Sequence, residues 1–101
     1  LADWAQRFDR LLIHLDVDVL DFLDLPLAEN TRRNVGLKLD QLMIALTLLL
    51  AAPNFAALTI CEVNPDHGAT DGSTLATFVD ALADSFAEAR RIRTAALRAA
   101  T

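Results

Sequence analysis

The stretch Leu11-Leu12-Ile13-His14-Leu15-Asp16-Val17-Asp18-Val19 decides the fold of this chain. It is apolar, continuous and partly β-branched, and it is followed by a polar loop, a pattern typical of a buried strand. We therefore predict a strand over Leu11–Val19. Because successive side chains of a strand point to opposite faces, His14, Asp16 and Asp18 are expected on one face. That face would be wholly polar.

The rest of the chain alternates between helical and strand patterns. The expected elements, in chain order, are a short amphipathic segment at Trp4–Arg10, an irregular loop at Asp21–Gly36, a helix at Leu39–Ala51, a second buried strand at Ala57–Val63, and a helix that begins at Ser73 as its N-cap. The first long helix is apolar almost all round, which predicts burial on more than one side. The last helix carries an apolar stripe formed by Leu75, Phe78, Val79, Leu82 and Phe86.

This order predicts an α/β fold with parallel strands joined by a right-handed crossover. A parallel sheet needs cover on both faces, whereas the 101 residues supply about two strands and two to three helices. The composition is 53% hydrophobic, which is high for so short a chain. We therefore expect the missing strands to lie upstream in a longer polypeptide.

The charge balance and the apolar runs exclude several classes of protein. A net charge of −5 argues against nucleic acid as a partner, because duplex-binding proteins rely on Lys and Arg at phosphates. The basic cluster Arg90, Arg91, Arg93 and Arg98 is best explained as a solvated helix end, and residues 89–101 as a helix extension or tail. The longest apolar run, Leu42–Ala52, is shorter than the roughly 20 residues of a membrane span, so no membrane is expected. The lone Cys61 suits a reducing compartment and predicts a cytoplasmic protein.

Acidic residues follow both predicted strands. Asp16 and Asp18 end the first strand, and Glu62 ends the second, so both strands bring carboxylates to the same edge of the sheet. Buried carboxylates are costly unless cations or donors compensate them, and paired Asp oxygens suit Mn or Mg. Helix capping or solvation of the two Asp residues, and an arginine partner for Glu62, remain open as alternatives.

Two motifs resemble the ureohydrolase superfamily, which includes arginase, agmatinase and formiminoglutamase. Residues 12–21 are similar to its late metal-binding motif, an apolar strand ending in Asp-x-Asp and followed by Leu-Asp. Glu62-Val63-Asn64-Pro65 is similar to its last acidic motif, and Gly36-Leu37 also matches. The likeness covers most of residues 11–86. It implies a three-layer α/β/α fold with a parallel sheet, in which 1–101 is the C-terminal segment of one arginase-like domain.

The resemblance also implies a dimanganese site. Asp16 would bridge two Mn²⁺ ions, Asp18 would ligate one of them, and Glu62 would hold the guanidinium or amidinium of a small substrate. His14 would support the site without binding metal. The reaction would be hydrolysis of a guanidino or amidino C–N bond with release of urea, in a trimer or hexamer.

Several features depart from the family pattern. Phe22 stands where the family places Pro, and residues 28–34 replace a Gly-Thr-rich loop that lines the substrate mouth. Asn30, Arg32 and Arg33 are therefore either substrate-mouth residues or solvated loop residues. The early motifs that supply His and further Asp ligands are absent, and His67 matches no ligand position. We therefore predict that this chain needs the rest of the catalytic domain and is inactive alone.

Three alternatives compete with this interpretation. A haloacid-dehalogenase-like phosphatase also ends a strand in Asp-x-Asp, but it usually continues with a tight glycine turn, which Val19-Leu20 does not offer. A calcium loop would need a glycine that this stretch lacks. The third alternative is a degenerate homologue or fragment that serves assembly.

Overall fold

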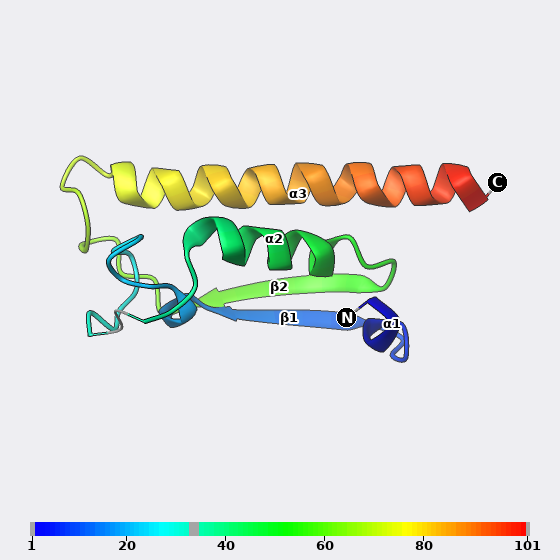
Figure 1. Cartoon of the computed structure of the whole chain (residues 1–101), viewed down its shortest axis with the longest axis horizontal. Helices are drawn as coiled ribbons and strands as arrows, with labels where there is room; N and C mark the ends of the chain where they lie inside the picture. Colours follow the sequence, from blue (N-terminus) through cyan, green and yellow to red (C-terminus); the bar gives the residue numbers. More distant parts are fainter. Residues whose placement is uncertain (1, 33–34, 101) are drawn as a thin grey trace.

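The computed structural model describes residues 2–32 and 35–100. The elements are α1 (Ala2–Ala5), β1 (Leu11–Asp16), a 3₁₀ turn (Val17–Val19), α2 (Leu39–Leu50), β2 (Phe55–Cys61) and α3 (Ser73–Ala100). Figure 1 shows them in this order, with the last helix running the length of the molecule. The predicted α/β class is confirmed.

The two strands pair in parallel, as the apolar strand–helix–strand pattern predicts. Register partners include Leu12 with Ala57, His14 with Thr59 and Asp16 with Cys61, and an irregularity lies between Leu11 and Leu12. Parallel partners present their side chains to the same face of a sheet. The carboxyl ends of β1 and β2 therefore lie together, and the segments that follow the two strands leave the sheet at the same edge.

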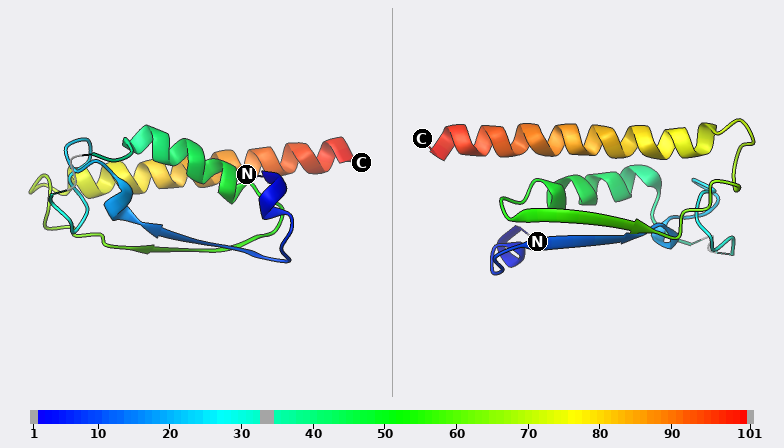
Figure 2. Two further views of the ribbon diagram at one scale, coloured as in Figure 1. Left: turned by 60° about the horizontal axis from the view of Figure 1, so that its bottom comes forward. Right: turned by 180° about the vertical axis from the view of Figure 1, so that it is seen from behind.

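Helices α2 and α3 lie on the same face of the sheet (Figures 1 and 2). The side chains that face them include Ile13 and Leu15, which pack in the main apolar cluster. On the opposite face Leu12 is 71% exposed and His14 is also exposed. Within the described residues the sheet is thus covered on one face, which differs from the cover on both faces that a parallel sheet needs.

The core forms between β1, the helices and the long loop. Its largest fully buried side chains are Val17, Leu20, Leu27 and Leu50. The predicted irregular loop is irregular, yet it supplies Leu25, Leu27 and Ala28 to this core. These apolar side chains hold residues 25–28 of this otherwise polar segment in the core.

Helix α2 buries one side only, which corrects the expectation of burial on more than one side. Leu42, Met43, Leu46 and Leu50 are buried, whereas Ile44 is 67% and Leu48 58% exposed. Its first turn is capped from outside, because the Asp24 carboxylate accepts a hydrogen bond from the backbone N–H of Leu39 at 2.8 Å. A helix N-terminus leaves N–H groups unpaired, so this contact ties the loop to the helix.

The prediction that Ser73 is the N-cap of α3 is wrong. Ser73 is the first helical residue, and the carbonyl of Gly72 accepts the N–H of Ala76 at 3.0 Å. Gly72 has a φ of +82°, a left-handed conformation that glycine adopts without steric cost. The Ser73 N–H is satisfied by the Asp71 carboxylate at 2.9 Å. A hydrogen bond with the Ser73 side chain, and to a lesser extent this backbone bond, lowers the pKa of Asp71.

Three other predicted boundaries also differ. β1 ends at Asp16 instead of Val19, because the Asp16 side chain caps the 3₁₀ turn that follows. β2 spans Phe55–Cys61 instead of Ala57–Val63, since Glu62 takes a conformation that leaves the strand. The first helix is Ala2–Ala5, earlier than the expected Trp4–Arg10.

Helix α3 has 28 residues, and residues 89–100 continue it. Of its predicted stripe, Phe78 is buried and Leu75 and Leu82 are half-buried, while Val79 is 51% and Phe86 39% exposed. The Arg93 guanidinium donates to the carbonyl of Leu50 at the end of α2. The radius of gyration is 15.0 Å, larger than the roughly 13 Å of a compact domain of this size. No helix in the described part of the chain is long and apolar enough to cross a membrane.

Candidate functional site

The carboxylates that follow the two strands share one edge of the sheet. Asp16 is the last residue of β1 and pairs with Cys61, the last residue of β2, so Glu62 lies one residue beyond that pair. Parallel pairing makes this unavoidable, because both strands run in the same direction and end together. The acidic residues from two parts of the chain are therefore neighbours.

Asp18 belongs to the turn and not to the strand. One carboxylate oxygen of Asp16 accepts the N–H of Asp18 at 2.8 Å, which closes the 3₁₀ turn over Val17–Val19. The expectation that His14, Asp16 and Asp18 alternate along one strand face is therefore wrong for Asp18. The Asp18 carboxylate in turn accepts the N–H of Asn30 at 3.0 Å. Among the described residues, one oxygen of each carboxylate thus accepts a hydrogen bond from a backbone N–H, and the other oxygen makes no such bond.

Glu62 has a strained backbone. Its φ is 64°, in the left-handed region that residues with a Cβ atom rarely adopt. Such a conformation costs about 1–2 kcal/mol and persists where the surroundings hold it, often at functional sites. Here the Glu62 carbonyl accepts the N–H of Glu29 at 2.8 Å, and the side chain is exposed. The sequence pattern gave no sign of this strain.

His14 lies on the open face of the sheet among β2 residues. Its Nδ1 is 2.7 Å from the Thr59 hydroxyl, and its Nε2 is 3.3 Å from the Cys61 sulfur. Thr59 and Cys61 had no predicted role here, although parallel pairing brings them to this face. Partial burial raises the pKa of the Cys61 thiol, and the nearby carboxylates of Asp16, Glu62 and Asp18 raise that pKa further. All three carboxylates therefore lie near enough to this thiol to disfavour its deprotonation.

The predicted substrate-mouth loop lies beside the same edge. Asn30 donates its N–H to Asp18, and its side-chain oxygen accepts the N–H of Arg32 at 3.0 Å. The Asn30 and Arg32 side chains are exposed. Arg33 lies outside the described residues. Asn30 therefore contacts Asp18, a predicted metal ligand, and Arg32 is bonded in turn to the Asn30 side chain.

A clamp between two loops, unpredicted from the sequence, surrounds Glu62. Ala28 and Val63 form an antiparallel bridge, with the Asn64 N–H bonded to the carbonyl of Leu27 at 2.9 Å. The Asn64 side chain also donates to the Glu29 carboxylate at 2.8 Å. The partners are 35 residues apart in the sequence, so no local pattern reveals them. We call this set of contacts between residues 27–30 and 62–67 the loop clamp.

The carboxylates at this edge are side chains of the kind that bind divalent cations. Asp16 and Asp18 supply carboxylate oxygens, which suit Mn²⁺ and Mg²⁺. Among residues 2–32 and 35–100, no group of three or more His, Cys, Asp or Glu side chains is arranged to hold a metal ion. The residues present therefore fit a share of a metal centre, and further ligands would have to come from elsewhere.

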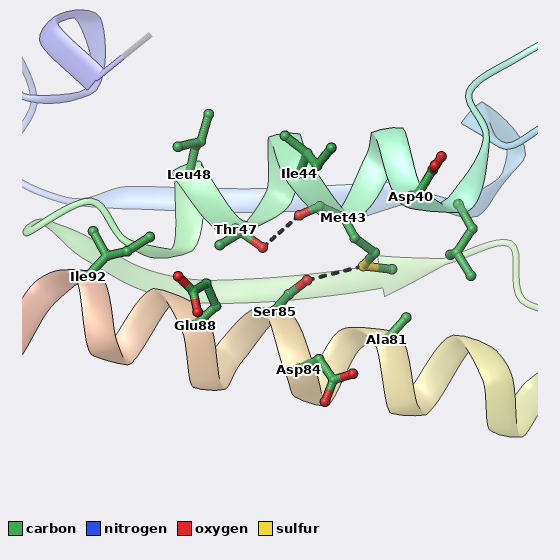
Figure 3. Close-up of a pocket in the computed structure, with 11 residues that line it drawn as sticks. Asp40, Met43, Ile44, Thr47, Leu48, Ala81, Asp84, Ser85, Glu88 and Ile92 are labelled. Carbon is green, nitrogen blue, oxygen red and sulfur yellow. Dashed lines mark hydrogen bonds between the residues drawn. The ribbon is translucent and has the colours of Figure 1, made fainter.

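A separate groove of about 560 Å³ lies between α2 and α3 (Figure 3). Met43, Ile44 and Leu48 face it from α2, and Ser85 and Ile92 from α3, with a Ser85 hydroxyl contact to the Met43 sulfur at 3.4 Å. It contains none of the carboxylates at the sheet edge. Its lining is mainly apolar, so it reflects incomplete packing of two helices and is not the candidate site.

Two solved structures share this fold. The formimidoylglutamase of Bacillus subtilis matches with a TM-score of 0.66 and 28% identity, over 82% of this chain and 25% of its own. The arginase of Helicobacter pylori matches with a TM-score of 0.63 and 24% identity, over 83% of this chain and 29% of its own. No protein-family model matches the sequence, and neither does any curated protein.

Both of these proteins are members of the ureohydrolase superfamily, so the resemblance predicted from the two motifs is confirmed. The chain has the parallel sheet and helices of part of an arginase-like fold. It spans between 25% and 29% of the length of the two solved chains. At the level of the superfamily, its relatives are hydrolases.

Proposed function

We propose that this chain is part of a metal-dependent hydrolase that cleaves a C–N bond in a small guanidino or amidino compound, with release of urea or the equivalent amide. The observation that carries the proposal is the convergence of Asp16, Asp18 and Glu62 at one edge of a sheet of arginase-like fold. A haloacid-dehalogenase-like phosphatase has no comparable support, since the two structural neighbours are a formimidoylglutamase and an arginase.

Asp16 and Asp18 would hold manganese. One carboxylate oxygen of Asp16 accepts the N–H of Asp18, and the other would bind metal. One carboxylate oxygen of Asp18 accepts the N–H of Asn30, and its other oxygen would likewise bind metal. These hydrogen bonds to backbone N–H groups hold the two side chains in place without a bound ion. Two Mn²⁺ ions, when bound, supply a water of lowered pKa as the nucleophile. His14 would support the site through its hydrogen bonds to β2 and not as a ligand.

Glu62 would bind the cationic end of the substrate. A carboxylate can accept paired hydrogen bonds from the planar N–H groups of a guanidinium or amidinium. The left-handed backbone of Glu62 turns the chain out of β2 at this point, and the side chain is exposed, free to meet a ligand. Asn30 and Arg32, on the adjacent loop, would line the approach to it.

The remaining ligands and cover would come from the rest of a catalytic domain. The chain spans about a quarter of each neighbour, and the open face of the sheet and the exposed side of α2 leave room for further layers. A cytoplasmic trimer or hexamer is the assembly that we propose. Alone, the chain would be inactive.

The test is the manganese content of the complete polypeptide that contains this chain. In the parent we expect about two Mn per subunit. Asp16→Ala should lose both the bound metal and the hydrolase activity. Asp80→Ala is the matched control, since Asp80 is an exposed carboxylate on α3 and not in either segment that follows a strand, and it should keep both. A parent without bound Mn would instead favour a degenerate homologue with an assembly role. Urea release by residues 1–101 alone would contradict the need for the rest of the domain.

A further inference from the structure

His67 lies in the loop that follows Glu62 and belongs to the loop clamp. Its Nδ1 is 2.8 Å from the carbonyl oxygen of Ala28, and its ring packs edge-on against Phe22 with centroids 5.8 Å apart at 84°. A carbonyl only accepts hydrogen bonds, so Nδ1 must carry the proton. Nε2 is then the acceptor that faces the Asn64 side-chain amide at 3.5 Å. Both ring nitrogens are therefore directed at the clamp.

Three consecutive residues link His67 to the candidate site. The carbonyl of Ala28 accepts from His67, the N–H of Glu29 donates to the Glu62 carbonyl, and the N–H of Asn30 donates to the Asp18 carboxylate. The Ala28 carbonyl and the Glu29 N–H belong to one planar peptide unit, so their directions are fixed relative to each other. The bond from His67 thus orients the N–H that holds Glu62, and the next peptide unit holds Asp18.

The contact has a local reason to persist. Ala28 is 1% exposed, and a buried carbonyl that loses its hydrogen-bond donor is destabilised because no water replaces that donor. The adjacent Glu62 is strained and needs its surroundings to hold it at positive φ. Without the imidazole, the Ala28 carbonyl could regain a donor only by moving toward water. That movement would weaken the hydrogen bond from the Glu29 N–H to the Glu62 carbonyl.

From these contacts we infer that His67 is a positioning residue, which holds the substrate-binding Glu62 at a fixed place relative to Asp18. The inference rests on the proposed function for the role of Glu62. It concerns substrate binding and not metal binding, because His67 contacts Phe22, Ala28 and Asn64, which are not the predicted metal ligands.

The test compares two variants of the complete enzyme that are both polar. His67→Asn places an amide N–H near the position of Nδ1 and should keep the bond to Ala28. His67→Gln is longer and cannot donate from that place. We expect KM for the guanidino or amidino substrate to rise about tenfold or more in His67→Gln, with kcat and Mn content near those of the parent. In His67→Asn, KM should stay within about threefold of the parent.

Thr70→Ala, an exposed change in the same loop, is the control and should alter neither constant. Equal KM values for the Asn and Gln variants would overturn the inference, and so would a fall in kcat with unchanged KM. Amide hydrogen exchange at Glu29 separates this result from a failure of the proposed function. Faster exchange in His67→Gln but not in His67→Asn supports the positioning of Glu62, even if the parent hydrolyses no substrate. Unchanged exchange in both variants overturns it.

Discussion

The two ends of the sheet are built differently. At the amino end, Ala5, Leu11 and Ala52 form a small buried apolar cluster, and the Asn54 amide donates to the carbonyls of Ala5 at 2.7 Å and Phe8 at 2.9 Å. At the carboxyl end, the chain places carboxylates, a residue at positive φ and two polar loops that clamp each other. One end joins chain segments through apolar contacts, and the other concentrates charge.

This difference separates residues that stabilise the fold from residues that are available for chemistry. Carboxylates gathered at one place repel each other, and a strained backbone costs free energy, so neither feature helps the fold. Their presence at the same edge is understandable if a ligand compensates them. The amino end carries a cost of another kind, because the buried Oδ1 of Asn54 has no hydrogen-bond partner within residues 2–32 and 35–100. The difference can be tested by changing one residue at a time at each end.

The largest effect is expected at Asp18. Asp18→Asn in the complete enzyme should lower kcat/KM by about a hundredfold or more and reduce the Mn content. The amide oxygen of Asn can still accept the N–H of Asn30, so the folded structure should not be weakened. Activity assays and metal analysis test this, with thermal unfolding as the control. A variant with full activity and full Mn would remove Asp18 from the site.

The amino end should respond in the opposite way. Asn54→Ala removes two hydrogen bonds to backbone carbonyls and should lower the free energy of unfolding by about 1–2 kcal/mol, measured in urea. The values of kcat and KM per folded molecule should stay the same, because Asn54 lies at the far end of the strands from Asp16. A loss of activity as large as that of Asp18→Asn would contradict the division between the two ends.

A smaller effect is expected from relief of the strain at Glu62. Glu62→Gly should raise the free energy of unfolding by about 0.5–1 kcal/mol relative to Glu62→Ala, because glycine adopts a φ of 64° without a Cβ clash. Both variants should lose substrate affinity equally. Urea unfolding and a substrate-binding titration measure the two quantities. If the Gly and Ala variants are equally stable, the strain at this position is absent.

The smallest effect concerns the Cys61 thiol. Its pKa is raised above the ordinary value of 9.0 by partial burial and by three carboxylates, so the folded state keeps the proton where the unfolded chain releases it. Folding stability should therefore decline slightly as pH rises above about 9, and Cys61→Ala should abolish that part of the decline. Alkylation at pH 8 should be slower in the folded protein than in urea. Faster alkylation in the folded state would show a different charge environment.

The sequence allowed the layout of the fold to be predicted, but not the turns that end the strands. Periodicity and apolar runs placed both strands, α2 and the start of α3 within a few residues. Val17–Val19 is as apolar as a strand, yet it forms a turn because the Asp16 side chain bonds to the N–H two residues later. Such side-chain competition with the strand depends on geometry, which composition does not reveal. The exposure of Ile44 and Leu48 was missed because the prediction assumed further packing layers.

The candidate site could be predicted in part for a similar reason. Asp16 and Glu62 follow from parallel topology, which brings strand ends together whatever the loops do. The clamp that holds Glu62 could not be predicted, because the contacts of Asn64 with Glu29 and of His67 with Ala28 join residues 35 and 39 positions apart. Polar contacts over such separations carry no periodic signal. The role that we propose for His67, which matched no ligand position, follows from its spatial neighbours Phe22, Ala28 and Asn64.

Helix α3 has a consequence for how the molecule responds to heat. At 28 residues it is about 42 Å long, against about 18 Å for the 12 residues of α2, and its C-terminal end extends past the sheet (Figure 1). There Leu97 is 70% exposed. The residues around it are mostly Ala and Arg, which favour helix even without packing. This extension should therefore unwind gradually from Ala100 inward on warming, well before the strands separate, and contribute a sloping baseline to the far-UV melting curve.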